Sequence, residues 1–428
     1  MTVEEPEERV ENGNAGYPES TNRTQRDPER NDKRSDPARR SAFRALVQDF
    51  SPIWFTWCMN AGVIGTLLHQ LPYQFSGLRV LSTIAFCVDL VLYIVFSILY
   101  TLHFLIYRRQ AYAELIGSVT ELCLLPCWCI AWMTLTAFIS LTVSNAPWGG
   151  HGFTILAVVM WWIATAWMYG LLFFAFSTLI RQHTIISPDE QLPALIIIPA
   201  VGVSTLALVG AVVATYSYNL SARLAVPVII MSFCSVGIGI LLGLKLCTYL
   251  FHQLLAKGWP APANTPTLFM FIGPMGQSAA ALQLLGSAAN THGAFGDYHR
   301  GMFLTSTAAS VLEVACVLLA LFMSGLGAIW MVLAFIGMLD RAIHRELMWT
   351  PTWNAIIFPT GTLVTSLLLL SQEMDSPFFR VVTAIIVVFL VIVFFINLGF
   401  TLTRIWQGKL LIVEQDPRVA AKEEMKDK

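Results

Sequence analysis

The chain has 428 residues, of which 56% are hydrophobic and only 12% are charged, and its mean hydropathy is +0.64. Soluble domains carry about 25% charged residues, so the composition excludes an ordinary soluble protein and predicts a membrane protein. The formal net charge of -1 comes from one tail and a few loops. Basic and acidic residues are interspersed there, which argues against nucleic-acid binding.

The first forty residues are polar and rich in Glu, Arg, Asn, Asp and Pro. Such a segment cannot bury enough apolar surface to fold alone, so we expect residues 1–40 to be a disordered tail. The first apolar run begins near Ala45, too far along the chain for a cleaved leader. We expect the membrane domain to span 45–408 and a second tail to span 409–428.

Ten apolar runs follow, each long enough to cross about 30 Å of hydrocarbon as a helix. They cover residues 52–71, 80–106, 119–143, 153–180, 193–216, 225–251, 266–288, 307–338, 352–371 and 379–406. The chain is therefore predicted to be an all-α polytopic membrane protein with ten transmembrane helices.

Basic residues in the loops between these runs are concentrated on alternate sides. One side carries the Arg-rich N-terminal tail with Arg108, Arg109, Arg181, Lys257, Arg341, Arg345, Arg404, Lys409 and Arg418; the other carries only Arg79, Arg223, Arg300 and Arg380. Because cytosolic loops hold an excess of Lys and Arg, the pattern predicts that both termini are cytosolic.

Proline recurs inside the odd-numbered runs, at Pro126, Pro199, Pro274 and Pro359. Proline interrupts a helix, and a broken helix at membrane depth is tolerated where its backbone faces protein or a water-filled cavity. We therefore expect five helical hairpins, each with a kinked odd helix inside, around a central pore, and a straight, bulky even helix outside.

The polar residues of the odd runs are mostly uncharged, as suits a small anion that must also be released. The candidates for lining the path are Asn60, Gly62, Thr134, Thr205, Gly273, Gln277, Ser278, Thr360 and Thr362. For each of these alone, a packing role is the alternative.

Charged residues within the runs are few and costly. Asp89 and Glu313 lie on even runs, where pairing between helices is expected, and Glu121 begins an odd run, where a role at the cytosolic mouth is conceivable. The eight cysteines lie in apolar runs and are expected to be buried apolar side chains, with no metal site. The sequon Asn219-Leu220-Ser221 lies in a short external loop, and whether it is glycosylated stays open.

Several motifs resemble the tellurite-resistance/dicarboxylate transporter family. They are Pro52-Ile53-Trp54-Phe55 with Met59 and Gly62, Trp161-Trp162, residues 271–278 (FIGPMGQS), and Trp353 with Phe358-Pro359-Thr360-Gly361. The family includes bacterial tellurite-resistance channels, plant slow anion channels, fungal malate permeases and fungal sulfite efflux pumps, and the last look most similar. The resemblance implies ten helices, a pore formed by the five odd helices in each protomer, a trimer, and a phenylalanine, here Phe358, that occludes the pore.

The leading hypothesis is therefore export of sulfite or bisulfite across the plasma membrane through a pore gated by Phe358. One alternative is uptake of malate or a related dicarboxylate, although the odd runs lack the mid-depth Lys or Arg that a dicarboxylate would favour. Another is a receptor or scaffold that transports nothing. The sequence has no Walker loop, convincing pair of catalytic carboxylates or HExxH motif, so neither an enzyme nor a cofactor is predicted.

Overall fold

The computed structural model describes residues 42–182, 192–407 and 410. The chain divides into two units, Met1–Ala42 and Phe43–Lys428, and the helices below belong to the second unit, apart from the first residue of α1. The predicted tails 1–40 and 409–428 lie outside the described residues, except for residue 410, and remain predictions.

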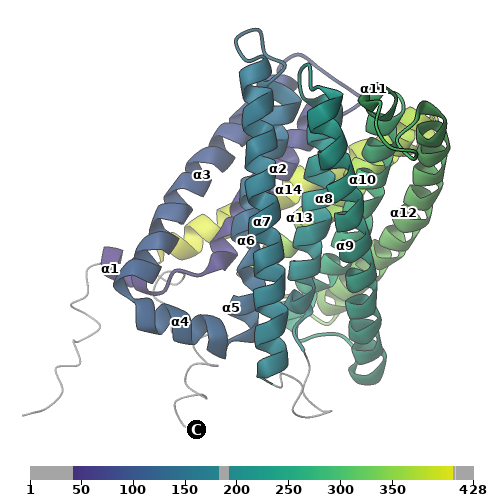
Figure 1. The fold of residues 1–428 in the computed structure, drawn as a ribbon. Helices are drawn as coiled ribbons and strands as arrows, with labels where there is room; N and C mark the ends of the chain where they lie inside the picture. The colour runs from purple at the N-terminus through teal and green to yellow at the C-terminus, as the bar shows by residue number, and fades with distance from the viewer. Residues whose placement is uncertain (1–41, 183–191, 408–409, 411–428) are drawn as a thin grey trace, which may run out of the picture. The chain divides into compact units, whose positions relative to one another are not determined.

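The described residues form helices joined by loops, with no β-strand among them (Figure 1). The α-helices are α1 (Ala42–Gln48), α2 (Phe55–Gln70), α3 (Leu78–Ile106), α4 (Arg108–Gly117), α5 (Val119–Leu124), α6 (Pro126–Phe138), α7 (His151–Arg181), α8 (Ile198–Tyr216), α9 (Ala222–Lys257), α10 (Ile272–Ala289), α11 (Ala294–Tyr298), α12 (Ser306–Ile343), α13 (Ile357–Glu373) and α14 (Pro377–Trp406). Short 3₁₀ helices precede four of them: η2 (Pro52–Trp54), η4 (Ala194–Ile197), η5 (Pro262–Phe271) and η6 (Pro351–Ile356). A π-helical turn, η3 (Ile139–Val143), ends α6.

Within the described ranges, nine helical stretches are long and apolar enough to cross a membrane. They correspond to the second to tenth predicted runs, which confirms an all-α polytopic membrane protein. The first predicted run contains η2 and α2, and α2 has only 16 residues. Its crossing of the membrane, and with it the total of ten, stays a prediction.

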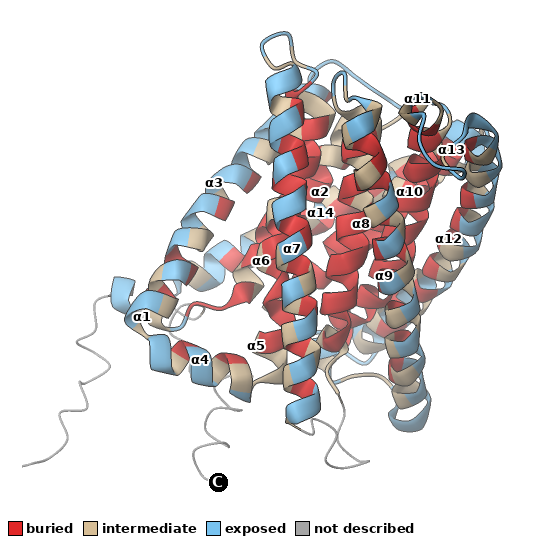
Figure 2. Cartoon of the chain, viewed as in Figure 1, coloured by how far each residue is buried: buried red, intermediate tan, exposed pale blue. Residues whose placement is uncertain are grey.

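The spanning stretches alternate between buried and exposed. In the most apolar window of Val119–Val143, Ala194–Tyr216, Pro262–Ala289 and Pro351–Glu373, between 78% and 100% of the residues are buried; in the five even stretches the share is 17% to 44%. Figure 2 shows the same contrast between α8 or α10 and α3 or α12. The odd helices therefore lie inside and the even helices outside, as predicted.

The buried helices pack against one another in a closed ring. α2 contacts α6, α6 contacts α8, α8 contacts α10, α10 contacts α13, and α13 contacts α2 again. Each outer helix packs against members of this ring: α3 on α2, α7 on α8, α9 on α8, α12 on α10 and α14 on α13. The N-terminal ends of the five ring segments lie together at one end of the ring, since residues of each line one cavity.

The four prolines of the odd runs mark the starts of α-helices. Pro126 is the first residue of α6, Pro199 the second of α8, and Pro274 and Pro359 the third of α10 and α13. Amide groups in the first turn have no partner within the α-helix, so proline is tolerated there. The predicted kinks are thus changes from a short preceding helix to an α-helix.

Three short helices were not predicted, because they lie in segments that we considered only for their charge: α1, α4 and α11. The expectation that all eight cysteines are buried is wrong for two of them. Cys87 on α3 and Cys234 on α9 are exposed, and the other six are buried. Both exceptions lie on outer helices, where apolar residues face outward as often as inward.

Candidate functional site

The five ring segments enclose a cavity of about 530 Å³ at their N-terminal ends. Its lining reaches no further along the segments than Asn60 in α2, Cys127 in α6, Val201 in α8, Phe271 in η5 and Pro359 in α13. One residue from each segment therefore marks the closed end of this cavity. If the predicted orientation is correct, the cavity faces the cytosol.

Phe358 lines this closed end. It is the second residue of α13, with Pro359 after it and η6 before it, and only 5% of its surface is exposed. Its helix is held close to α2, since a Cβ atom on Gly361 would lie 2.8 Å from Cγ2 of Val63. Because this backbone is held in place, the aromatic ring can leave the closed end only by rotation of its side chain or by movement of η6.

Among the described residues that line the cavity there is no Lys, Arg or His, whereas Asp49, Glu114 and Glu121 are present. Glu121 has a structural partner that the sequence did not reveal: Ser51 Oγ donates to both of its carboxylate oxygens, at 3.0 and 2.9 Å. Its backbone N–H donates to Ser118 Oγ at 3.3 Å, so Ser118 caps α5. The predicted location of Glu121 at the mouth agrees with its contact with the cavity.

Several predicted path residues lie beyond the closed end of the cavity. Gln277 on α10 donates through Nε2 to Thr205 Oγ1 on α8 at 2.6 Å, so the structure brings these two together. Gly273 packs tightly, since a Cβ atom there would lie 3.2 Å from Val201 Cγ2 and 3.9 Å from Pro359 Cβ. The ring is therefore narrow at this level, where α8, η6–α13 and α10 approach one another.

Polar atoms without a partner are present in the same helices. Gln277 Oε1, Ser278 Oγ and Thr360 Oγ1 are buried and have no hydrogen-bond partner in the part of the chain that the structure describes. Thr362 Oγ1, in contrast, donates to the carbonyl of Pro359 at 2.7 Å. Because buried polar atoms normally have partners and an anion is bound by hydrogen-bond donors, the hydroxyls of Ser278 and Thr360 are the better candidates for contacting a passing anion. The amide oxygen of Gln277 can only accept a hydrogen bond.

Gly62 and Thr134 have a different environment from the other candidates. A Cβ atom on Gly62 would lie 2.5 Å from Thr134 Cβ and 2.7 Å from Asp89 Oδ2 of the outer helix α3. Thr134 Oγ1 donates to Asp89 Oδ2 at 2.9 Å. This contact gives Gly62 and Thr134 a packing role between α2, α3 and α6, and it confirms that Asp89 pairs between helices; their predicted role in the path has no support from these contacts.

Asn60 is part of an amide cluster that sequence reasoning missed. Its Nδ2 donates to Asn354 Oδ1 at 3.0 Å, and Asn397 Nδ2 of the outer helix α14 donates to the same oxygen at 2.6 Å. Asn354 Nδ2 donates in turn to Thr56 Oγ1 at 3.0 Å, and Trp349 Nε1 donates to Asn397 Oδ1 at 2.7 Å. No local motif joins these positions, so only the folded chain reveals the cluster.

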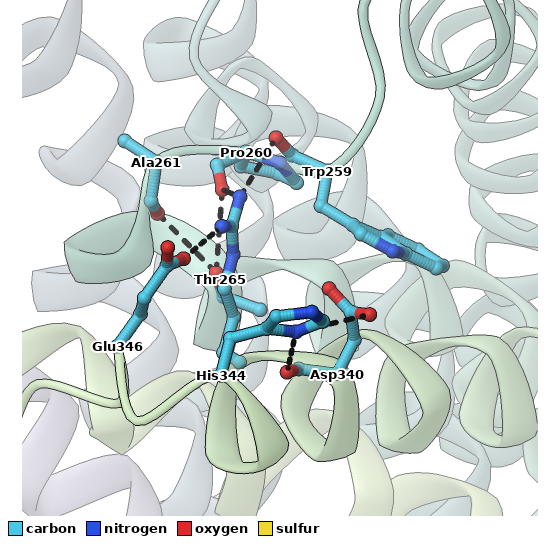
Figure 3. A network of polar contacts seen from close by, with 8 residues as sticks. Trp259, Pro260, Ala261, Thr265, Asp340, His344 and Glu346 are labelled. Atoms are coloured by element: carbon cyan, nitrogen blue, oxygen red, sulfur yellow. Dashed lines mark hydrogen bonds and ion pairs between the residues drawn. The ribbon is translucent and has the colours of Figure 1, made fainter.

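The rim of the cavity is braced from the end of α12 (Figure 3). Arg341 donates through Nη2 to the carbonyls of Pro260 at 3.0 Å and Trp259 at 3.4 Å, and it forms an ion pair with Glu346. Pro260 lines the cavity. Arg341, which the sequence analysis used only to predict the orientation in the membrane, therefore also holds the loop that leads into η5.

Comparison with known proteins gives a consistent result. Residues 49–402 match the family model described as voltage-dependent anion channel. The sulfite efflux pump SSU1 of Trichophyton rubrum is 25% identical over 342 residues, which cover 78% of this chain and 85% of the relative. The malic acid transport protein of Schizosaccharomyces pombe is 24% identical over 350 residues, 81% of this chain and 76% of the relative. An uncharacterized transporter of Methanocaldococcus jannaschii is 22% identical over 326 residues, 75% of this chain and 83% of the relative.

Proposed function

Because the chain belongs to the voltage-dependent anion channel family, as the sequence resemblance indicated, we propose that it exports sulfite or bisulfite through a pore in each protomer. The pore follows the axis of the five-helix ring, and Phe358 closes it at the inner end of the cavity. Proteins of this family and the named relatives are channels and transporters rather than enzymes.

The observation that carries the proposal is the cavity itself. It is enclosed by the five buried segments and ends at Phe358 and Pro359. Beyond this point the same helices carry buried hydroxyls that lack partners among the described residues, on Ser278 and Thr360. Movement of a single aromatic ring would therefore join an aqueous cavity to neutral groups suited to weak anion binding.

Two observations favour a small anion as the substrate. The sulfite efflux pump relatives match a large share of this chain, and the described cavity lining lacks the Lys or Arg that would pair with a second carboxylate. Malate uptake is the second candidate, because malic acid transport proteins of Schizosaccharomyces pombe are also 22% and 24% identical.

The proposal extends to the assembly and its location. The outer helices expose large apolar side chains, for example Val311 and Val314 on α12 and Ile385 and Phe395 on α14. Lipid and neighbouring protomers can cover such faces, as the proposed homotrimer in the plasma membrane requires. The charge pattern of the loops supports cytosolic termini. A receptor or scaffold would have the same outer faces but no need of the cavity.

The test is transport by the purified full-length chain in proteoliposomes. Uptake of radiolabelled sulfite and radiolabelled malate is measured separately, with and without a pH gradient, against protein-free vesicles. Saturable sulfite uptake that exceeds malate uptake is the expected result. Uptake of malate alone would establish the second candidate, and uptake of neither would favour a receptor or scaffold. A sulfite uptake rate that is the same with and without the pH gradient would indicate channel-like transport rather than proton coupling.

A further inference from the structure

One member of the amide cluster, Asn354, lies just before Phe358 in the sequence. Asn354 is in η6, about one helical turn before Phe358, and 96% of its surface is buried. Its side chain makes three hydrogen bonds, two accepted by Oδ1 from Asn60 and Asn397 and one donated by Nδ2 to Thr56. The cluster therefore fastens η6 to α2 on one side and to α14 on the other.

A second attachment holds the opposite end of η6. The hydroxyls of Thr350 and Thr352 both donate to the carbonyl of Ala263 in η5, at 2.9 and 2.8 Å. Asn60 Nδ2 also reaches the backbone carbonyl of Asn354 at 3.3 Å. The segment that precedes Phe358 is thus held by polar bonds to three neighbours, α2, α14 and η5.

We propose that Asn354 is a positioning residue for Phe358, and that the amide cluster Thr56–Asn60–Asn354–Asn397–Trp349 holds the gate closed. The inference rests on the proposed function, because it assigns a regulator to the same gate. Loosening the cluster allows η6 to shift and Phe358 to leave the axis of the ring. The outer helix α14 then affects anion flux although Asn397 and Trp349 do not line the cavity.

The test uses substitutions at the far end of the cluster. Asn397→Leu removes the amide that donates to Asn354 Oδ1 and keeps a similar volume. Trp349→Phe removes the indole N–H that donates to Asn397 and leaves a smaller aromatic ring beside Phe400. Loss of one neutral hydrogen bond changes an equilibrium by about two- to tenfold. We expect sulfite flux in proteoliposomes to rise by about that factor for Asn397→Leu and by less for Trp349→Phe.

A matched control is available on the same helix. Thr383 of α14 is fully buried, and its hydroxyl has no partner among the described residues. Thr383→Val therefore removes an equally buried polar group without touching the cluster, and its flux should equal that of the wild type. A substitution that merely damaged the fold would lower the flux and the yield of folded protein rather than raise the flux.

Combination with Phe358→Ala distinguishes positioning from a general effect. If the cluster acts through Phe358, then Asn397→Leu should add nothing in the Phe358→Ala background. The inference is overturned if Asn397→Leu and Trp349→Phe leave flux unchanged while Phe358→Ala raises it, or if the effects of Asn397→Leu and Phe358→Ala simply multiply. In both cases the proposed function stands. Absence of sulfite flux in every variant, the wild type included, would instead defeat the proposed function and the inference with it.

Discussion

Phe358 and Phe269 both lie near the start of a ring helix and are similarly buried, but their neighbours differ. Phe358 lines the closed end of the cavity, whereas Phe269 of η5 does not line it and packs against Phe335 of α12, with ring centroids 5.1 Å apart. Substitution of these two residues can therefore distinguish the proposed obstruction of the pore by Phe358 from the packing role of Phe269.

Phe358→Ala should raise sulfite flux severalfold, because it removes the ring from the end of the cavity while Pro359 and Gly361 keep α13 in place. Phe269→Ala should destabilise the protein by about 3–5 kcal/mol, as is typical of a buried phenylalanine, and should not raise flux. Flux per folded protein in proteoliposomes and thermal unfolding in detergent check both. Equal flux in Phe358→Ala and wild type would remove Phe358 from its proposed role.

Two buried glutamines of α10 make a second informative pair. Gln277 donates to Thr205 of the ring helix α8, and Gln283 donates to Ser366 of the ring helix α13, which in turn contacts Ser324 of the outer helix α12. Oε1 of each glutamine has no partner among the described residues. Both glutamines thus lie between ring helices, but only Gln283 belongs to a chain of polar contacts that continues to the outer helix α12.

We expect Gln277→Ala to change the half-saturating sulfite concentration by about fivefold, the value of one neutral hydrogen bond. Gln283→Ala should lower stability but leave half-saturation unchanged. Concentration-dependent uptake by the two variants is the measurement. A normal half-saturation value in Gln277→Ala would argue that α10 presents this side chain to neighbouring helices only.

At the scale of helices, glycines set how closely the ring elements approach. A Cβ atom on Gly276 of α10 would lie 2.5 Å from the backbone nitrogen of Leu363 in α13, while one on Gly325 of α12 would meet nothing within 4 Å. Small residues of this kind allow membrane helices to pack closely. The contact between α10 and α13 therefore depends on Gly276.

Gly276→Ala should destabilise the protein by about 1–3 kcal/mol, because backbone atoms must move to admit the methyl group. Gly325→Ala should be neutral or stabilising, since alanine favours the helix by about 1 kcal/mol. Thermal unfolding of the two variants in the same detergent provides the comparison. An unfolding temperature for Gly276→Ala as high as that of wild type would show that α10 and α13 are further apart than described here.

The helices and their order could be predicted from the sequence because each span must be apolar and long enough to cross the bilayer. Long apolar runs satisfy that requirement, and the strict recurrence of Pro126, Pro199, Pro274 and Pro359 in alternate runs distinguishes the inner helices. The exact form of the interruption was not predictable, because a short 3₁₀ helix or α-helix followed by a second α-helix has the same apolar composition as a kinked helix.

The contacts between helices could not be read from the sequence in the same way. Gly62 and Thr134 resemble pore residues by type and depth, yet they contact Asp89, because the direction of a side chain around a nearly uniformly apolar helix leaves no periodic signal. Asn354 and Asn397 were missed for a related reason. An isolated asparagine carries no motif, and its importance arises only when a distant helix supplies its partner.

At the scale of the whole molecule, the orientation in the membrane decides what the cavity does. Export requires the cavity to open to the cytosol, where the substrate is collected, and the charge pattern of the loops predicts this orientation. Both ends of α12 carry an exposed methionine nearby, Met302 before the helix and Met348 after it, with 97% and 56% of their surfaces exposed. They lie on opposite sides of the membrane in the predicted topology.

Met302→Cys should react with a charged, membrane-impermeant maleimide added to intact cells, and Met348→Cys should react only after the cells are permeabilised. The unsubstituted protein is the control for its natural cysteines, of which Cys87 and Cys234 are exposed only on apolar outer helices and are out of reach of a charged reagent in the bilayer. Met348 lies between α12 and η6, at the end of the ring where the cavity is found, so its labelling reports the side on which the cavity opens. Labelling of Met348→Cys from outside, with Met302→Cys protected, would place the cavity and both termini outside the cell and would contradict the predicted orientation.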